Sequence, residues 1–399
     1  MGGETRRANW MILSDTPTFI FWASMLVDAV VAGAVLFRPW RRAGEGDGPV
    51  AIRLSDVFVT AVVTGAVFVG KWLVLQSWGF RFFGLIHLVY LDIVVLMPAM
   101  GVGVLLAGRR RWGRGPWRRV LGPVRALACV CVALGPAGVY ATYIEPFRLQ
   151  LETARIAVPV EREGSGPIRI GVLSDIQTAQ VTDYERTAVA RLMALAPDVI
   201  LMPGDLFQGS DEMFERELPA LRDLLSRLSA PGGVYFVQGD VDGLERVERV
   251  LDGTQVRLLY NEVVHGEVGD RWLTIGGVQL AHRREAARRV VGELEWAPWT
   301  ADIRILLSHA PDVMLGLAPD SRIDLVVAGH THGGQVQIPF FGPPFIASDV
   351  PREVGAGGYH ELDGRRVYVS RGVGCERGHA SRVRFGARPE ISLLTLGDP

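Results

Sequence analysis

The chain has 399 residues, a formal net charge of −1 at pH 7, and 49% hydrophobic residues. This length predicts two domains rather than one small core, and the near-neutral charge gives no reason to expect a nucleic acid or an acidic partner. Cys129, Cys131 and Cys375 are its three cysteines, and they indicate neither a disulfide framework nor a cysteine metal site.

Long apolar runs occupy much of the first 145 residues. Each run is close to the roughly 20 helical residues that span about 30 Å of hydrocarbon. One such run is compatible with a buried core helix, whereas four in succession indicate a membrane bundle of about four helices. The runs are Phe19–Phe37, Val57–Leu75, Phe83–Leu106 and Leu127–Ile144.

Two features of these runs leave alternatives open. Two arginines precede the first run, so it is either a retained span or a cleaved signal peptide, and the three later runs favour retention. Asp28 and Asp92 interrupt runs, and a charged group in lipid is costly. They either line a polar pathway or face the bundle interior beside a partner such as Lys71 or Arg81; we expect the second.

Arginine distribution predicts the orientation of the chain in a membrane. The segment between the third and fourth runs holds Arg109, Arg110, Arg111, Arg114, Arg118, Arg119 and Arg125. By the positive-inside rule this segment is cytoplasmic. Both termini, and everything after Ile144, are then expected outside the cytoplasm. The predicted location is therefore the cell membrane, with several spans and an extracytoplasmic second half.

The second half has an α/β pattern, so the predicted domains are residues 1–145 and 146–399. Short apolar strands alternate with amphipathic helices at residues 184–195 and 214–228. The strands Ile168–Ser174, Val199–Met202 and Val234–Val237 are followed by Asp175, Asp205 and Asp240. Ligands in open α/β sheets bind beyond the carboxyl ends of strands, so we expect the three carboxylates to converge. The alternative is that each Asp only forms a turn or a helix cap.

Histidines follow two further predicted strands. Ile303–Ser308 ends at His309, and Leu325–Ala328 ends in a Gly-His-Thr-His-Gly-Gly-Gln stretch that contains His330 and His332. Imidazole and carboxylate together suit zinc, manganese or iron rather than calcium alone. If two metal ions lie about 3.5–4 Å apart, one carboxylate must bridge them.

These motifs resemble the calcineurin-like metallophosphoesterase family, in the branch with membrane spans before the hydrolase domain. The resemblance covers about residues 168–396. The motifs are Ser174-Asp175, Gly204-Asp205, Ser308-His309-Ala310-Pro311-Asp312, the stretch Gly329–Gln335, the tail Tyr368–Gly372 and Pro389-Glu390-Ile391. The resemblance implies an α/β fold, namely a four-layer α/β/β/α sandwich preceded by about four transmembrane helices.

The resemblance also implies a set of metal ligands. Asp175 and His332 would hold the first metal ion, His309 and His330 the second, and Asp205 would bridge both. Asp240 stands where the family usually has an asparagine ligand to the second metal, and its carboxylate oxygen can serve instead. Both Asp205 and Asp240 are therefore candidate catalytic residues as well as ligands.

Two positions depart from the family pattern. Gln177 replaces the histidine of the first motif, so its amide carbonyl is a weaker candidate ligand. Val241 replaces a histidine that acts on the transferring phosphoryl group, and valine has no such chemistry. His379, beside Arg377 or Arg382, is the candidate replacement, although a solvated loop is the simpler interpretation of those three. Arg371 is a further candidate for binding substrate.

The predicted function is metal-dependent hydrolysis of phosphoester or pyrophosphate bonds by metal-activated water. The expected cofactors are two divalent ions (Mn, Fe or Zn), and the expected substrate is lipid-linked or belongs to the cell envelope. The alternative is a catalytically impaired, metal-binding membrane scaffold or sensor. A transporter with a regulatory domain is a weaker alternative, because Asp28 and Asp92 are the only acidic residues within the apolar runs. The sequence does not indicate an oligomeric state.

Overall fold

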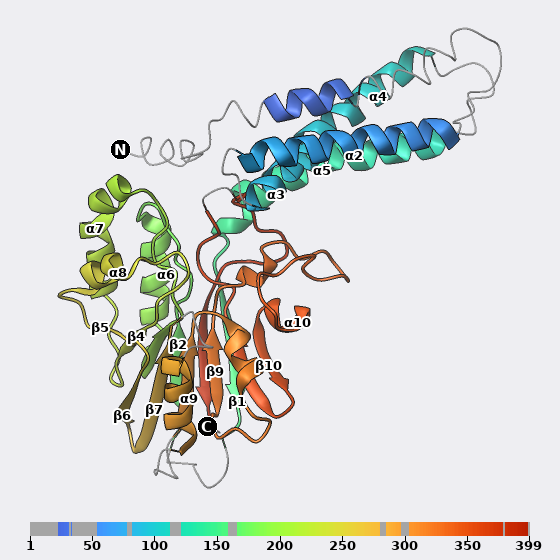
Figure 1. Ribbon diagram of the computed structural model, residues 1–399. Helices are drawn as coiled ribbons and strands as arrows, with labels where there is room; N and C mark the ends of the chain where they lie inside the picture. Colours follow the sequence, from blue (N-terminus) through green and yellow to red (C-terminus); the bar gives the residue numbers. More distant parts are fainter. Residues whose placement is uncertain are drawn as a thin grey trace. The chain divides into compact units, whose positions relative to one another are not determined.

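The computed structural model (Figure 1) describes residues 23–31, 33, 54–77, 82–111, 121–158, 166–279, 285–296, 303–377 and 380–397. The chain divides into two compact units. One comprises Met1–Tyr140 with Gly378–Ser381, and the other comprises Ala141–Arg377 with Arg382–Pro399. Each unit is described separately below.

Helices make up the described part of the first unit. Residues 23–31 are helical, and the longer helices are α2 (Leu54–Ser77), α3 (Phe82–Leu91), α4 (Met97–Arg111) and α5 (Leu121–Tyr143). A π-helical turn, η2 (Asp92–Leu96), joins α3 to α4 without a break. Such turns are rare and occur mostly as bulges within α-helices.

Two described helices are long and apolar enough to cross a membrane: Phe83–Leu106 and Val124–Phe147, with mean hydropathies of 2.2 and 1.7. Only 11% and 17% of these segments are buried, whereas a core helix of a soluble protein is mostly buried. Of the other two expected spans, Val57–Leu75 falls within α2, whose described apolar part is Gly65–Val74. Phe19–Phe37 lies partly outside the described residues. The described residues therefore contain two candidate spans, and the count of four stays a prediction.

Polar and small residues hold the helices of this unit together. Lys71 forms an ion pair with Asp28, which confirms the partner expected for that aspartate, and it also donates to the carbonyl of Ser24 at 3.1 Å. Gly138 lies against α3–η2: a Cβ there would come within 2.6 Å of Val94. Such small residues let membrane helices approach closely.

The second unit contains two six-stranded sheets. The first has the order β1 (Gln150–Ile156), β12 (Glu390–Leu396), β2 (Ile168–Val172), β3 (Val199–Met202), β4 (Val234–Phe236), β5 (Val256–Leu258). The second has the order β10 (Gly358–Leu362), β11 (Arg365–Val369), β9 (Leu325–Ala328), β8 (Ile303–Ser308), β7 (Arg271–Val278), β6 (Glu262–Val268). The predicted strands therefore form, and β3, β8 and β9 have the predicted bounds.

Side chains point alternately to the two faces of each strand, and both faces of each sheet are therefore covered by another layer. In β3, Val199 and Leu201 point into the core between the sheets, while Ile200 and Met202 point to the opposite face. That face is covered by α6 (Asp183–Met193), α7 (Asp211–Ser226) and α8 (Leu244–Leu251), which lie together on one side of the strands (Figure 1). The outer face of the second sheet is covered by α9 (Glu285–Trp296), η6 (Pro311–Gly316) and α10 (Arg352–Gly355). The unit is an α/β/β/α sandwich.

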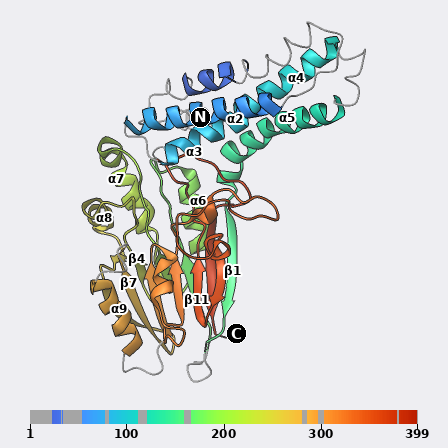
Figure 2. The ribbon, with the colours of Figure 1, turned by 45° about the vertical axis from the view of Figure 1, so that its right-hand side comes forward.

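One edge of the first sheet gathers the features that matter for function. Because β2, β3 and β4 are parallel, their carboxyl ends share this edge. Strand β12 runs antiparallel to β2 and parallel to β1, with Gln150 opposite Glu390, so β1 begins at the same edge. The chain reaches β1 from α5 through the short helix η4 (Glu145–Phe147), and Figure 2 shows β1 continuing from that segment. We call this edge the entry edge.

Candidate metal centre

The candidate ligands share an unusual backbone conformation. Asp175, Asp205, His330 and His332 follow β2, β3 and β9, and all have positive φ angles of 47°, 56°, 69° and 49°. A non-glycine residue in this region costs on the order of 1–3 kcal/mol, and such residues concentrate at functional sites. The neighbouring loops must therefore stabilise these turns.

Two glycines make room for the carboxylates. A Cβ at Gly239 would lie 2.0 Å from Oδ1 of Asp205, and a Cβ at Gly329 would lie 2.3 Å from Oδ2 of Asp175. Both distances are far below van der Waals contact, so only glycine allows the backbone to approach each carboxylate this closely.

The structure brings six predicted ligands together in two groups of three. Asp175, Asp205 and His332 form one group, and Asp240, His309 and His330 form the other. Within each group the potential ligand atoms lie within 4.8 Å of one another. The groups adjoin, because Nε2 of His309 lies 3.5 Å from Oδ2 of Asp205. The site is mostly buried: Asp175 and His309 are fully buried, and Asp240 is the exposed member, at 45%.

The orientation of His309 and His330 suits a cation shared by the two rings. Nδ1 of His309 donates to the carbonyl of Pro203 at 2.6 Å, and Nε2 of His330 donates to the carbonyl of Ala347 at 2.8 Å. The two remaining ring nitrogens face each other at 3.1 Å. In two neutral imidazoles these would be opposed lone pairs, so a proton or a metal ion must lie between or beside them.

Asp242 fixes the two loops that carry Asp205 and Asp240. Its buried carboxylate accepts three backbone N–H bonds, from Asp205 at 2.8 Å and from Leu206 and Gly239 at 2.9 Å. The sequence analysis did not assign it a role. The available signal was its position three residues after Gly239 in a Gly-Asp-x-Asp turn, the spacing at which aspartate caps a loop.

The electrostatics of the cluster also favour a cation. Burial, opposed by His309 and reinforced by Asp175, raises the pKa of Asp205 to about 9. Burial likewise raises the pKa of Asp175 to about 6. Burial lowers the pKa of His309, but the carboxylates of Asp205 and Asp240 outweigh it and raise that pKa to about 10. Without a metal ion, the cluster therefore holds protons in place of positive charge.

Two buried polar atoms provide an independent test of whether metal ions fit. Nε2 of His332 and Oε1 of Gln177 are buried without a hydrogen-bond partner. Buried nitrogen and oxygen acceptors are rarely left unsatisfied, and both are suitable metal ligands. The donor set therefore fits divalent metal ions.

Gln177 is held by an arrangement that the sequence analysis missed. Its Nε2 donates to Oε2 of Glu376 at 3.0 Å and to Oε1 of Gln208 at 3.1 Å. Gln208 donates in turn to Oε1 of Glu376 at 2.8 Å. A 180° flip of the Gln177 amide would place its oxygen against the Glu376 carboxylate, where two acceptors would face each other. Glu376 therefore fixes the amide with Nε2 bonded and Oε1 without a hydrogen bond.

The predicted substrate-binding arginines differ in their partners and in their distance along the chain from the candidate ligands. The Arg371 guanidinium pairs with Glu390 and, at 3.4 Å, with Glu152. Nε of Arg377 donates to the backbone carbonyl of Gln177, which places Arg377 beside the ligand loop. Burial and the charge of Arg382 lower the pKa of Arg377 to about 9. The remaining candidate, His379, lies outside the described residues.

The side chain of Val241 has no polar group, but its backbone N–H donates to Oδ1 of Asp205 at 3.1 Å. This position therefore orients the carboxylate through the main chain and offers no acid or base.

Comparison with known proteins identifies the same region. Residues 168–334 match the family model for calcineurin-like phosphoesterases. The metallophosphoesterase YkuE of Bacillus subtilis is 26% identical over 282 residues, which cover 68% of this chain and 93% of that protein. The phosphodiesterase YaeI of Escherichia coli is 27% identical over 267 residues, which cover 64% of this chain and 92% of that protein.

A third relative is a transmembrane protein with a metallophosphoesterase domain from Bos taurus. It is 28% identical over 268 residues, covering 60% of this chain and 56% of that protein.

Two facing sheets with carboxylates and histidines gathered at their strand ends define a metal-dependent hydrolase. The matched region then identifies the second unit as a calcineurin-like metallophosphoesterase, an enzyme that hydrolyses phosphate esters. The predicted family and enzyme class are thereby confirmed.

Metal binding at this site should release protons. Asp205 and His309 form a tightly coupled pair in which burial raises the pKa of Asp205 and the neighbouring carboxylates raise the pKa of His309, so the pair holds at least one proton at pH 7. A cation that binds both groups must displace that proton, so metal affinity should rise as the pH is raised above 7. Calorimetric titration with Mn²⁺ in buffers of different ionisation enthalpy measures the number released. Asp205→Asn should release about one proton fewer, and release of none by the parent protein would contradict the assignment.

Proposed function

We propose that the second unit hydrolyses a phosphodiester or pyrophosphate bond of a lipid-linked or envelope substrate at a centre of two divalent metal ions. The observation that carries this proposal is the pair of opposed imidazoles, His309 and His330, beside the buried carboxylates of Asp175 and Asp205. Manganese, iron and zinc match this mixture of nitrogen and oxygen ligands.

In this proposal each group of three residues holds one metal ion. Asp175 and His332 hold the first, together with Oε1 of Gln177, and Asp240, His309 and His330 hold the second. Asp205 bridges them, as its position next to both groups supports. Two bound ions supply Lewis acidity and lower the pKa of water toward neutrality.

The remaining residues hold the ligands and meet the substrate. Asp242 and Gly239 keep the Asp205 carboxylate in place, and Glu376 orients Gln177. Arg377, beside the Gln177 loop, is the arginine proposed to neutralise a phosphate oxygen. Because Val241 supplies no acid, a proton for the leaving oxygen must come from water or from another residue, for which His379 is the proposed candidate.

A membrane-resident substrate is supported by where the chain enters the hydrolase unit. We propose domains of 1–145 in the membrane, with four spans, and 146–399 outside it. The candidate span Val124–Phe147 ends three residues before β1, which begins at the entry edge, and the ligand loops leave β2 and β3 at this same edge. The backbone N–H of Arg384 donates to the carbonyl of Ala141 at 2.9 Å, and the Arg384 guanidinium reaches Nδ1 of His332 at 3.4 Å. This link between Ala141, at the start of the second unit, and the candidate ligand His332 supports the proposal of a substrate in the bilayer surface.

The bridging role of Asp205 can be tested directly. Asp205→Asn should bind fewer than two equivalents of Mn²⁺, because a neutral amide oxygen bridges two cations poorly. Turnover of bis-p-nitrophenyl phosphate should fall by more than about 100-fold, beyond the loss expected from an outer partner of a ligand. Asp223→Asn, an exposed change on α7, is the matched control. A parent that binds two metal ions but does not turn over this substrate or a pyrophosphate would favour the impaired scaffold instead.

The role of Glu376 is tested by metal affinity rather than by rate. Glu376→Gln lets the Gln177 amide rotate, so the affinity for one of the two metal ions should fall by about 10–100-fold, as for other outer partners of metal ligands. Affinity for the other ion should be unchanged. Glu361→Gln, at the exposed position of β10, is the matched control. Two unchanged affinities in Glu376→Gln would remove Gln177 from the ligand set.

The proposed orientation places residues 109–125 in the cytoplasm and the hydrolase unit outside it, because arginines crowd that segment. A reporter fused after Pro399 should be active only in its extracytoplasmic form, alkaline phosphatase, and inactive as a cytoplasmic fluorescent protein. The opposite pattern would overturn both the orientation and the number of spans.

A further inference from the structure

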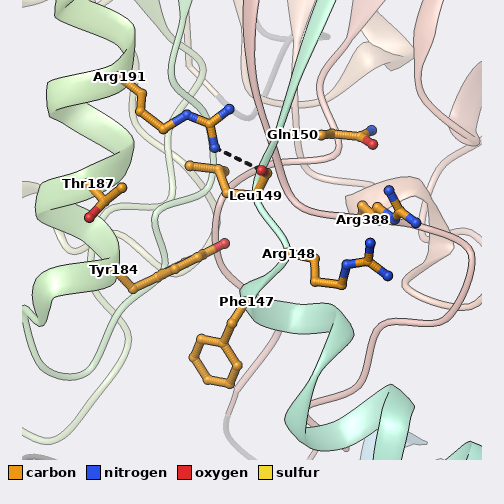
Figure 3. Close-up of a pocket in the computed structure, with 8 residues that line it drawn as sticks. All are labelled: Phe147, Arg148, Leu149, Gln150, Tyr184, Thr187, Arg191 and Arg388. Atoms are coloured by element: carbon orange, nitrogen blue, oxygen red, sulfur yellow. Dashed lines mark hydrogen bonds between the residues drawn. The ribbon is translucent and has the colours of Figure 1, made fainter.

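A second polar pocket opens in the hydrolase unit, outside the metal centre. It has a volume of about 320 Å³ and lies where the segment after α5 meets α6 and the start of β12 (Figure 3). Its lining residues are Phe147, Arg148, Leu149, Gln150, Tyr184, Thr187, Arg191 and Arg388.

The charge of this pocket is one-sided. Three of its described lining residues, Arg148, Arg191 and Arg388, are arginines, and none of them is acidic. One nitrogen of Arg191 donates to the carbonyl of Leu149 at 2.9 Å, which fixes its guanidinium at the pocket (Figure 3). Three guanidinium groups around one small volume favour the binding of an anion there. Arginine's planar fork suits phosphate oxygens in particular.

The rest of the lining suits the neighbourhood of a lipid headgroup. Phe147 packs edge-on against the Tyr184 ring, with ring centroids 5.5 Å apart, while Gln150 and Thr187 offer polar groups. Phe147 is also the last residue of the candidate span Val124–Phe147, and Arg148 is the first residue after it. Arginines directly after a span lie at the depth of the phosphate groups of a bilayer.

The pocket is also connected to the metal centre. The Tyr184 hydroxyl donates to the carbonyl of Val373 at 3.0 Å. The N–H of Val373 donates in turn to the carbonyl of Ser174 at 3.0 Å. The N–H of the next residue, Gly374, donates to the carbonyl of the candidate ligand Asp175 at 2.7 Å. Both the pocket and the ligand loops lie at the entry edge.

We propose that this pocket binds the phosphate group of an anionic phospholipid and so holds the entry edge of the hydrolase unit at the bilayer surface. The inference rests on the proposed membrane anchoring. It concerns a site separate from the metal centre, and its ligand is retained rather than hydrolysed.

The test uses the full-length, metal-loaded protein in a non-ionic detergent. It is titrated with short-chain phosphatidylglycerol and, separately, with inorganic phosphate, and binding is followed by calorimetry. The variant is the double substitution Arg148→Gln with Arg388→Gln. The matched control is Arg155→Gln, an exposed arginine at the opposite end of β1. All three proteins keep the same metal centre, so phosphate bound there cancels in the comparison.

The parent and Arg155→Gln should bind phosphatidylglycerol saturably, and the double variant should bind it at least about tenfold more weakly, because two charge-assisted contacts are lost. Inorganic phosphate should bind the pocket more weakly than the lipid. Equal lipid binding by the double variant and the control would overturn the proposal. Inorganic phosphate binding as tightly as the lipid would overturn the lipid as its source.

Failure of this inference is distinguishable from failure of the proposed function. Turnover of bis-p-nitrophenyl phosphate should be unchanged in the double variant, since neither arginine belongs to the metal centre. Resistance to extraction by alkaline carbonate reports anchoring in the membrane independently of lipid binding in the pocket. An anchored, active protein whose double variant binds the lipid as the parent does would refute the pocket alone.

Discussion

The hydrolase unit is organised around a repulsion between like groups that only a cation removes. Asp175 and Asp205 are buried carboxylates, and one ring nitrogen of His309 faces one ring nitrogen of His330 at 3.1 Å. Burial raises the pKa of Asp205, and the neighbouring carboxylates raise the pKa of His309, so protons are retained in this cluster. The turns with positive φ angles and the glycines around them hold these carboxylates and imidazoles close together despite their repulsion. A site that is unfavourable when empty has a strong preference for being filled.

The sandwich makes such a site possible because its strands deliver side chains to one edge from both sheets. β2, β3 and β4 bring the carboxylates, and β8 and β9 bring the imidazoles. The helices on the outer faces bury the alternate residues of each strand, so the strands cannot slide without exposing apolar side chains. Register therefore determines ligand geometry. Asp242 extends that control into the loops by joining the turn after β3 to the turn after β4.

Much of this arrangement was predictable from the sequence, and the remainder depends on long-range contacts. β3 and β9 are continuous apolar runs closed by Pro203 and Gly329, and β8 is apolar apart from Arg304 and Ser308, so both their existence and their bounds could be predicted. β6 (Glu262–Val268) mixes polar and apolar residues and gave no such signal. The partnership of Gln177 with Glu376 joins residues 199 positions apart, and no local pattern contains it. The π-helical turn at Asp92 also lacks a simple sequence signature.

The short connection between α5 and β1 has a consequence for kinetics. Only Arg148 and Leu149 separate the end of the candidate span Val124–Phe147 from β1, which begins at the entry edge. With α5 anchored as proposed, we expect the hydrolase unit to stay near the bilayer and to meet the proposed lipid-linked substrate by lateral diffusion. The relevant concentration is then the mole fraction of substrate among the lipids rather than its amount per volume. Diluting a membrane with inert lipid slows such an enzyme, whereas adding more membrane of the same composition leaves its rate unchanged.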